Sequence, residues 1–181
     1  MTHRIRQLNE KIAFENPFVT VFDDEVEFPG GRIGHYVRVA AAVSGAPVVL
    51  LAYWRGTIAL VRTYRYPIGQ AEWALPRGFS QGGAVKENAQ QELLEELGVD
   101  EASLKVLGHV HPDSGLLSTR AAVVLAQVDH VAGPRKDAEE VEAVQWVSPP
   151  VLDAMIRDGE IEDGFTLASW LLAKLHQALP E

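Results

Sequence analysis

Three glutamates lie at a spacing that places them on one face of a helix. Glu92, Glu95 and Glu96 occupy positions i, i+3 and i+4 of a helix that we expect to begin near Ala84. Like charges at these spacings destabilise an isolated helix by roughly 0.2–0.5 kcal/mol per pair. A hard divalent cation bound by carboxylate oxygens would offset that repulsion. The spacing alone also occurs in many ordinary helices, so a metal site and a solvated helix edge in an acidic protein both fit it, and the surrounding sequence decides between them.

The helix itself is predicted by its apolar periodicity. Apolar residues recur every four positions and form one stripe: Val85, Ala89, Leu93 and Leu97. Gly98 suits the left-handed conformation that ends many helices, and Val99 can then fold back on the last turn. We expect the three carboxylates to border this stripe, neither fully solvated nor fully buried.

A strand, a glycine-bearing loop and this helix follow one another, and the series resembles the Nudix box. That box is Gly, five residues, Glu, seven residues, then Arg-Glu-apolar-any-Glu-Glu-any-Gly-apolar. Its last part is matched by Glu92, Leu93, Glu95, Glu96, Gly98 and Val99. Two positions differ, because Gln91 stands where the box has arginine and Gly83 stands where it has its first glutamate. The loop that begins at Gly78 is also one residue short.

Segments outside the box resemble the ADP-ribose pyrophosphatase branch of the Nudix superfamily. They are residues 61–67, the Leu-Pro-Arg-Gly run at 75–78, and residues 156–161. The resemblance covers residues 17–178 and implies an α/β/α sandwich with a mixed sheet. It also implies metal-dependent hydrolysis of a nucleoside diphosphate linked to another group. ADP-ribose, cleaved to AMP and ribose 5-phosphate, is the leading substrate, and Mg²⁺ is the expected cofactor, with Mn²⁺ as the alternative.

The resemblance also assigns candidate catalytic and metal-binding residues. Glu92 and Glu96 are the best direct metal ligands, Glu95 follows them, and the backbone carbonyl of Arg77 is a further ligand in the related pyrophosphatases. Related enzymes take a general base from the loop before a late strand. Glu139 and Glu140 are the two candidates there.

Three arginines are candidate substrate-binding residues, because arginine can bind phosphate bidentately: Arg62, Arg65 and Arg77. Arg62 and Arg65 have opposite parity in an expected strand, so we expect one of the two to face the ligand.

Gln91 and Gly83 support a second interpretation. An arginine at position 91 would hold a neighbouring carboxylate through charge-assisted hydrogen bonds, whereas glutamine offers weaker ones. Gly83 removes a further carboxylate. The alternative is therefore a Nudix-fold module that binds a nucleotide with little catalysis.

Composition limits the class of protein. The chain has 181 residues, 47% of them hydrophobic, which fits one domain with a small extension. Its net charge of −9 disfavours nonspecific binding to nucleic acid or anionic membranes. No apolar run approaches the ~20 residues of a membrane span. The absence of cysteine excludes disulfides, thiolate zinc sites and a cysteine nucleophile, and we expect a cytoplasmic protein.

The order of the expected elements suggests two parts. Residues 1–45 read as an N-terminal β extension with strands at 18–22, 26–28 and 36–39, whereas residues 1–16 favour no particular structure. Residues 46–181 read as the Nudix domain. Its expected strands are 48–54, 57–64, 72–75, 104–110, 121–128 and 141–147, and its expected helices begin at 84, 149 and 165. The extension also predicts a homodimer in which the small sheet packs against the partner and helps to close its site.

Overall fold

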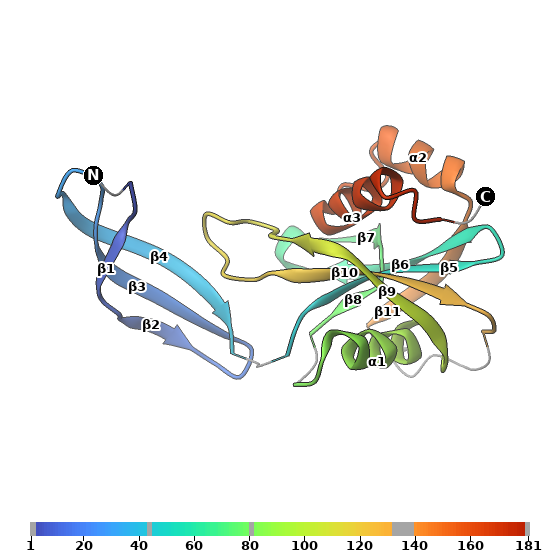
Figure 1. Cartoon of the computed structure of the whole chain (residues 1–181), viewed down its shortest axis with the longest axis horizontal. Helices are drawn as coiled ribbons and strands as arrows, with labels where there is room; N and C mark the ends of the chain where they lie inside the picture. The colour runs from blue at the N-terminus through green and yellow to red at the C-terminus, as the bar shows by residue number, and fades with distance from the viewer. Residues whose placement is uncertain (1–2, 43–44, 80–81, 132–139, 180–181) are drawn as a thin grey trace. The chain divides into compact units, whose positions relative to one another are not determined.

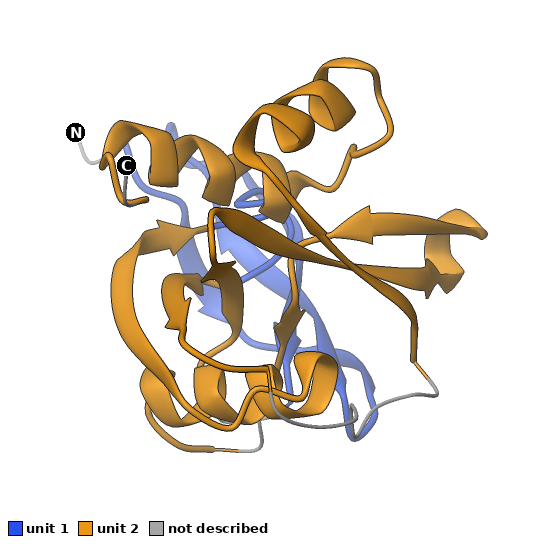
Figure 2. Ribbon diagram, turned by 90° about the vertical axis from the view of Figure 1, so that its right-hand side faces the viewer, with its two compact units in different colours: residues 1–44, 111–119 blue, residues 45–110, 120–181 orange. Residues whose placement is uncertain are grey.

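A computed structural model describes residues 3–42, 45–79, 82–131 and 140–179 of the chain. Two units can be distinguished (Figure 2). The smaller one comprises Met1–Ser44 with His111–Thr119, and the larger one comprises Gly45–Val110 with Arg120–Glu181. The loop 111–119 therefore groups with the N-terminal strands, although it is distant from them in sequence.

The described part of the larger unit is organised around a seven-stranded sheet (Figure 1). Its strands are β5 (Val48–Trp54), β6 (Thr57–Arg65), β7 (Gln70–Ala74), β8 (Arg77–Gly78), β9 (Ala102–Val110), β10 (Ala121–Val128) and β11 (Val141–Val147). The order is β11-β6-β5-β10-β9, with β7 beside β6 and β8 beside β5. Strands β5 and β10 are parallel and the other pairs are antiparallel, so the sheet is mixed, as predicted.

Helices cover both faces of this sheet (Figure 1). Helix α1 (Val85–Leu97) lies on one face, and α2 (Pro149–Arg157) and α3 (Gly164–Leu175) lie on the other. Side chains along β5 point alternately to the two faces of the sheet, so the hydrophobic core consists of two clusters, one on each face. Leu50 packs with the α1 residues Ala89 and Leu93, whereas Leu51 packs with residues of α2 and α3. The predicted α/β/α sandwich is confirmed.

Helix α1 ends as its sequence indicates. Gly98 has φ 69°, and the N–H of Val99 donates to the carbonyl of Leu93 at 3.1 Å. Val99 is fully buried, so it does fold back on the last turn. The predicted apolar stripe is confirmed at Ala89, Leu93 and Leu97, which are buried, while Val85 is partly buried.

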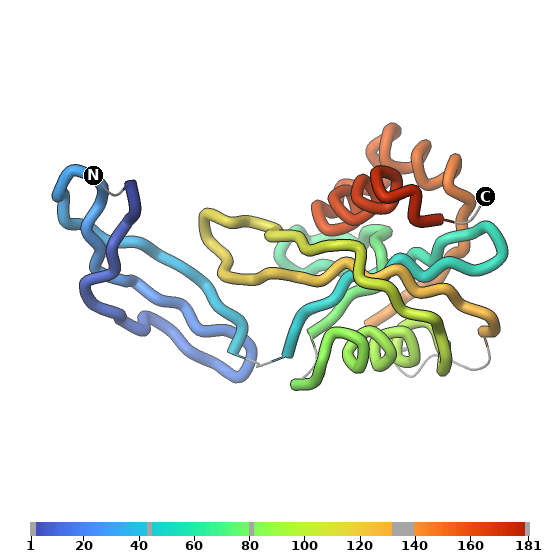
Figure 3. Tube along the Cα trace, in the orientation of Figure 1, coloured from blue at the N-terminus to red at the C-terminus, as the bar shows by residue number. Residues whose placement is uncertain are grey.

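Four antiparallel strands make up the sheet in the described part of the smaller unit. They are β1 (Arg6–Asn9), β2 (Ile12–Glu15), β3 (Val19–Glu27) and β4 (Ile33–Ala41), and β3 pairs with each of the others. Figure 3 follows the chain through β3 and its antiparallel partner β4. Strands β1 and β2 have four residues each and are exposed at every residue, and no structure was predicted for residues 1–16.

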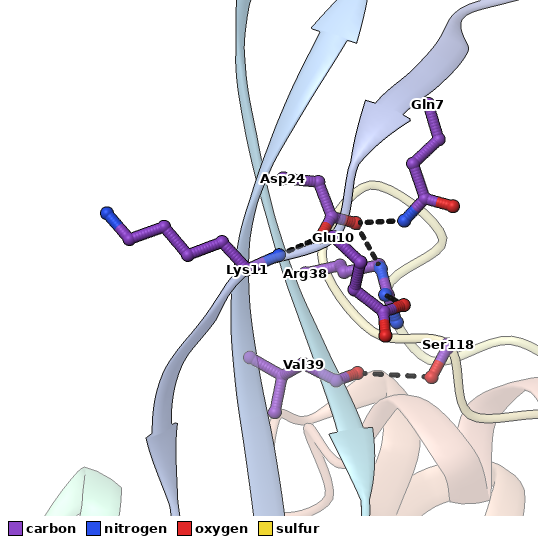
Figure 4. A network of polar contacts seen from close by, with 7 residues as sticks. All are labelled: Gln7, Glu10, Lys11, Asp24, Arg38, Val39 and Ser118. Carbon is purple, nitrogen blue, oxygen red and sulfur yellow. Dashed lines mark hydrogen bonds and ion pairs between the residues drawn. The ribbon is translucent and has the colours of Figure 1, made fainter.

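The expected break between residues 22 and 26 is wrong, because β3 is continuous there and a buried ion pair lies at that point (Figure 4). Asp24 is 3% exposed and accepts hydrogen bonds from Nε of Arg38 at 2.7 Å and from Nε2 of Gln7 at 3.0 Å. The backbone N–H of Lys11 donates to it at 3.3 Å. Burial raises the pKa of Asp24, but the hydrogen bonds and the charge of Arg38 outweigh burial and hold the pKa below its usual value.

Further differences concern the bounds of several elements and one expected loop, and β4 for example runs over Ile33–Ala41 rather than 36–39. Helix α3 stops at Leu175 rather than near residue 179, and Tyr66–Ile68 forms a short 3₁₀ turn where a loop is expected. Within the described ranges, no helix is long and apolar enough to cross a membrane.

Candidate functional site

Glu92 is the most enclosed of the three helix glutamates. It is 8% exposed, and its carboxylate lies against Gly78 of β8. A Cβ on residue 78 would stand 2.1 Å from Oε1 of Glu92, so glycine is needed there to leave room for the carboxylate. Helix α1 and strand β8 thus meet at this one charged group. The expectation that all three carboxylates would be only half-buried is wrong for Glu92.

Glu95 and Glu96 are partly buried on the same helix, as expected. Gln91 donates a hydrogen bond from Nε2 to Oε1 of Glu95, one turn further along. The glutamine therefore holds a carboxylate in place, which is the contact that we assigned to an arginine at this position. The negative charge of Glu96 acts on Arg77 and opposes the lowering of its pKa.

Arg77 is held on the side of the sheet that carries α3. Its Nη2 donates to Oδ1 of Asp163 at 2.9 Å, and its guanidinium lies 4.8 Å from the centre of the Phe165 ring. Burial lowers the pKa of Arg77, and the charge of Asp163 is the largest influence in the opposite direction. Nε of Arg77 is buried and has no hydrogen-bond partner among the described residues.

Arg62 and Arg65 do lie in different surroundings, as their opposite parity predicts. Arg62 is exposed and pairs with Glu142 of β11 at 3.1 Å. The charge of Arg65 acts on Arg77, and its Nε is also buried without a partner in the described part of the chain. Arg65 is therefore the one of the two that lies close to Arg77.

Glu72 joins this charged group from β7. Burial is the largest cause that raises its pKa, and the negative charges of Asp163 and Glu162 add to it. The positive charges of Arg65 and Arg77 oppose that rise without cancelling it. Two cations and three carboxylates thus influence one another near the N-terminal end of α3.

The two candidates for the general base are differently placed. Glu139 lies outside the described residues. Glu140 is exposed and directly precedes β11, in the loop position that the sequence indicates.

Gly83 has a structural role of its own. Its φ is +95°, and a Cβ there would stand 2.8 Å from Oδ1 of Asn88 and 3.0 Å from Oε2 of Glu87. Glu87 instead accepts a hydrogen bond from the N–H of Ala84 at 2.9 Å and so caps α1. The turn at position 83 therefore disfavours the glutamate that the Nudix box has there.

The chemistry of the donor set suits a hard cation. Within the described ranges, no cluster of three or more His, Cys, Asp or Glu side chains forms a ready metal site. Mg²⁺, however, needs only one or two carboxylates, because it keeps several of its waters. The carboxylate of Glu92, which lies against Gly78, and that of Glu96, which lies within the influence of Arg77, supply oxygen donors of this kind.

Asp163 and Glu72 were not identified from the sequence. Asp163 stands three residues before Thr166, a spacing typical of a helix start, and its carboxylate does accept from the N–H of Thr166. Its second partner, Arg77, is 86 residues away, and no local pattern predicts that contact.

Comparisons with known proteins identify the family of the chain and proteins that resemble it. The sequence profile of the family described as NUDIX domain matches residues 43–166. The ADP-ribose pyrophosphatase of Bacillus subtilis is 26% identical over 183 aligned positions, which cover 97% of this chain and 98% of that protein. The CMP-5'-(N-acetyl-N-hydroxy-3-aminopropyl)phosphonate hydrolase of Streptomyces rubellomurinus is 24% identical over 155 residues, which cover 83% of this chain and 72% of that protein.

A solved structure described as an ADP compounds hydrolase has the same fold. Its TM-score is 0.83 at 18% identity, and the match covers 97% of this chain and 95% of that one. The family profile spans more than half of the sequence, and it includes the β8 strand and the carboxylate helix that meet at Glu92. The chain belongs to the Nudix family.

Proposed function

We propose that the protein is a metal-dependent Nudix pyrophosphohydrolase that cleaves ADP-ribose to AMP and ribose 5-phosphate. The observation that carries the proposal is the Glu92 carboxylate, which is buried against Gly78 and lies on the same helix as Glu95 and Glu96. A full-length relative described as an ADP-ribose pyrophosphatase supports the choice of substrate.

In this proposal the glutamates bind the metal and the arginines bind the substrate. Glu92, Glu96 and Glu95, with the backbone carbonyl of Arg77, would hold Mg²⁺ or Mn²⁺. When bound, the cation neutralises charge on the diphosphate and lowers the pKa of a bound water. Glu139 or Glu140 accepts a proton from the attacking water.

Arginine side chains supply the positive charge that an anionic substrate needs in a protein of net charge −9. Arg77 uses Nη2 on Asp163, and because a guanidinium group carries five N–H donors, other donors of Arg77 remain for phosphate oxygens. Arg65 adds a second positive charge that acts on Arg77. Arg62 already pairs with Glu142 and makes the weaker contribution.

The test is a substrate screen with the purified protein and Mg²⁺ or Mn²⁺. ADP-ribose should give AMP and ribose phosphate at the highest kcat/KM in a panel of nucleoside diphosphate compounds. A CMP-linked phosphonate belongs in the panel, because one relative is described as a hydrolase of such a compound. Absence of turnover on every compound, with metal binding demonstrated, would rule the hydrolase out.

A binding module remains the second candidate, because Gly83 and Gln91 replace two charged residues of the box. Calorimetry with ADP-ribose and a nonhydrolysable analogue separates the two functions. Tight binding of both compounds without turnover supports the module, whereas turnover of ADP-ribose supports the enzyme.

We further propose a homodimer in which residues 1–45 form the dimerisation element. Val26 is the one buried hydrophobic residue in the described part of the smaller unit. Several apolar side chains on β2 and β4 are about half exposed: Ile12 52%, Phe14 54%, Ile33 52% and Val37 48%. A small sheet with so little core needs a further covering surface to be stable. A second copy of the same chain is the occupant that we propose.

Light scattering at micromolar concentration tests the dimer. The wild type should be dimeric, and the double substitution Ile33→Glu with Val37→Glu should be monomeric. Leu171→Glu, on the exposed side of α3, places a charge on the other unit and should leave the dimer intact. A monomeric wild type would reject this part of the proposal.

A further inference from the structure

The N-terminal end of α3 makes two separate connections to the segment that carries Arg77. The first runs through Thr166, whose Oγ1 accepts a hydrogen bond from the backbone N–H of Leu75 at 2.9 Å. The second is the ion pair from Arg77 to Asp163 at 2.9 Å. Two residues of one short segment, Leu75 and Arg77, are thus attached to a single helix end.

Asp163 joins these two connections. Its Oδ2 accepts from the backbone N–H of Thr166 at 2.9 Å and from the Thr166 hydroxyl at 2.7 Å, while Oδ1 accepts from Arg77. The Thr166 hydroxyl donates its one proton to Asp163, and its oxygen accepts from Leu75. These two hydrogen bonds form a relay that runs in one direction, from the Leu75 amide through the Thr166 hydroxyl to the Asp163 carboxylate. Leu75, Asp163 and Thr166 are all buried.

A helix cap alone does not account for this arrangement. One carboxylate oxygen satisfies the first turn of α3, as capping requires. The other oxygen is used on a side chain 86 residues away, which lies over the ring of Phe165. The ion pair also offsets the free-energy cost of removing the charges of Arg77 and Asp163 from water. If either residue lost its partner, the other charge would stay desolvated and destabilise the fold.

The same segment meets α1 on its other side. In β8, Arg77 is followed by Gly78, and the space next to Gly78 is filled by the carboxylate of Glu92. The N–H of Leu50 donates to the carbonyl of Pro76 at 2.8 Å, so β5 holds the segment between the two helices. A shift of the 75–78 segment would therefore displace the surface against which Glu92 rests.

We propose that Asp163 is a positioning residue, which, together with Thr166, fixes the Leu75–Gly78 segment so that Glu92 and the backbone carbonyl of Arg77 hold the metal in a productive geometry. The proposal rests on the proposed function for the identity of the metal site. Asp163 touches neither substrate nor metal in this scheme and acts through Arg77 and Thr166. Residues that orient metal ligands in this way typically change metal affinity or activity by about 10- to 100-fold when they are mutated.

Direct Mn²⁺ binding without substrate is the main measurement, by calorimetry or electron paramagnetic resonance. Asp163→Ser keeps a capping oxygen for α3 but removes the partner of Arg77. Thr166→Val keeps the shape of the side chain but removes the hydroxyl that links Leu75 to Asp163. Both variants should bind Mn²⁺ about 10- to 100-fold more weakly and lose kcat by a similar factor. Thr166→Ser, which retains the hydroxyl, should restore binding to near the wild-type value.

Asp153→Asn is the matched control. Asp153 also anchors α3, because it accepts from Nε1 of Trp170 at 2.7 Å and from Nζ of Lys174 at 2.7 Å, neither of which belongs to the 75–78 segment. Its substitution should lower the melting temperature and leave Mn²⁺ affinity unchanged. Wild-type Mn²⁺ affinity in folded Asp163→Ser would overturn the proposal, as would an equal loss of affinity in Asp153→Asn. If Asp163→Ser does not fold, the comparison of Thr166→Val with Thr166→Ser decides in the same way.

Hydrogen exchange separates this inference from the proposed function. Asp163→Ser should speed exchange of the Leu75 amide, although Asp163 does not contact that amide itself. Unchanged exchange at Leu75 would contradict the relay whether or not the protein hydrolyses ADP-ribose. The other outcome is that the Leu75 amide exchanges faster in Asp163→Ser, while the wild type binds Mn²⁺ but hydrolyses no substrate. That result would support the positioning role of Asp163 and reject the hydrolase.

Discussion

The carboxylate of Glu92 occupies the space in which a side chain at Gly78 would begin, 2.1 Å from the ideal Cβ position. Gly78 has no positive φ, so its backbone conformation is open to other residues, and the contact with Glu92 is what requires glycine. The carboxylate of Glu92 in α1 therefore limits the size of the side chain that residue 78 of β8 can carry.

Gly78→Ala should separate metal binding from folding. The atoms that must move belong to the end of a flexible glutamate, so the free energy of unfolding should change little. The displaced carboxylate, in contrast, loses its place in the metal site, and we expect Mn²⁺ affinity and kcat to fall by about tenfold or more. Gly164→Ala is the control, because a Cβ there meets nothing within 4 Å. Wild-type turnover in Gly78→Ala would show that the position of Glu92 is not critical.

Glu96→Gln tests the helix-borne metal site directly. The substitution removes an anionic oxygen, keeps the size of the side chain and relieves repulsion with Glu92, so the metal-free protein should be at least as stable. Magnesium affinity and turnover should fall together, with kcat reduced by roughly a hundredfold or more. Glu101→Gln lies outside the motif and should have little effect. Normal magnesium-dependent turnover in Glu96→Gln would mean that the site is wrongly placed, and unfolding would reveal a structural role.

Restoring the two missing residues of the box should give opposite outcomes. Gly83→Glu forces a side chain into a left-handed conformation and against Asn88 and Glu87, and we expect a loss of about 1–3 kcal/mol in the free energy of unfolding with no gain in turnover.

Gln91 is exposed and already contacts Glu95, so Gln91→Arg should be tolerated and should raise kcat through a charge-assisted bond. Urea unfolding and steady-state kinetics on both variants test this, and a stable, more active Gly83→Glu would refute our account of the turn.

Asp24 should make the stability of the protein depend on pH. Its pKa is held below the usual value in the folded state, so the ionised form stabilises the fold. That contribution is present above about pH 3.9, the pKa of an unfolded aspartate, and it is lost as the pH falls through the folded-state value. Urea unfolding should show Asp24→Asn to be less stable than the wild type at pH 7, with the difference shrinking as the pH falls below 3.9. A pH-independent difference would assign the effect to packing rather than to charge.

Local patterns predicted most of the larger unit. The alternation and length of apolar runs predict β10 and β11 with their observed ends, and the four-residue stripe predicts α1 with its glycine stop. These features depend on neighbours in sequence, which is why one chain suffices to find them. Strands β1 and β2 were not predicted, because each has only four residues and a pattern that short cannot be distinguished from a loop.

The candidate site could be only partly predicted from the sequence, because some of its contacts join residues that are far apart in the chain. Glu92, Glu95 and Glu96 are recognisable because one helix sets their spacing. The depth of Glu92 depends instead on Gly78, and the partner of Arg77 comes from the far end of the chain. Contacts of that kind are set by tertiary packing and leave no period in the sequence.

The attachment of Arg77 to Asp163 has a consequence for synthesis on the ribosome. Every residue of the Nudix box has been made once residue 99 has been added, yet the helix end that fixes the 75–78 segment comes more than sixty residues later. Because chains are made at about 5–20 residues per second, the box stays without that anchor for several seconds of elongation. A nascent chain that carries every carboxylate of the motif therefore still lacks the contacts of Leu75 and Arg77 with α3, and these can form only after residue 166 has emerged.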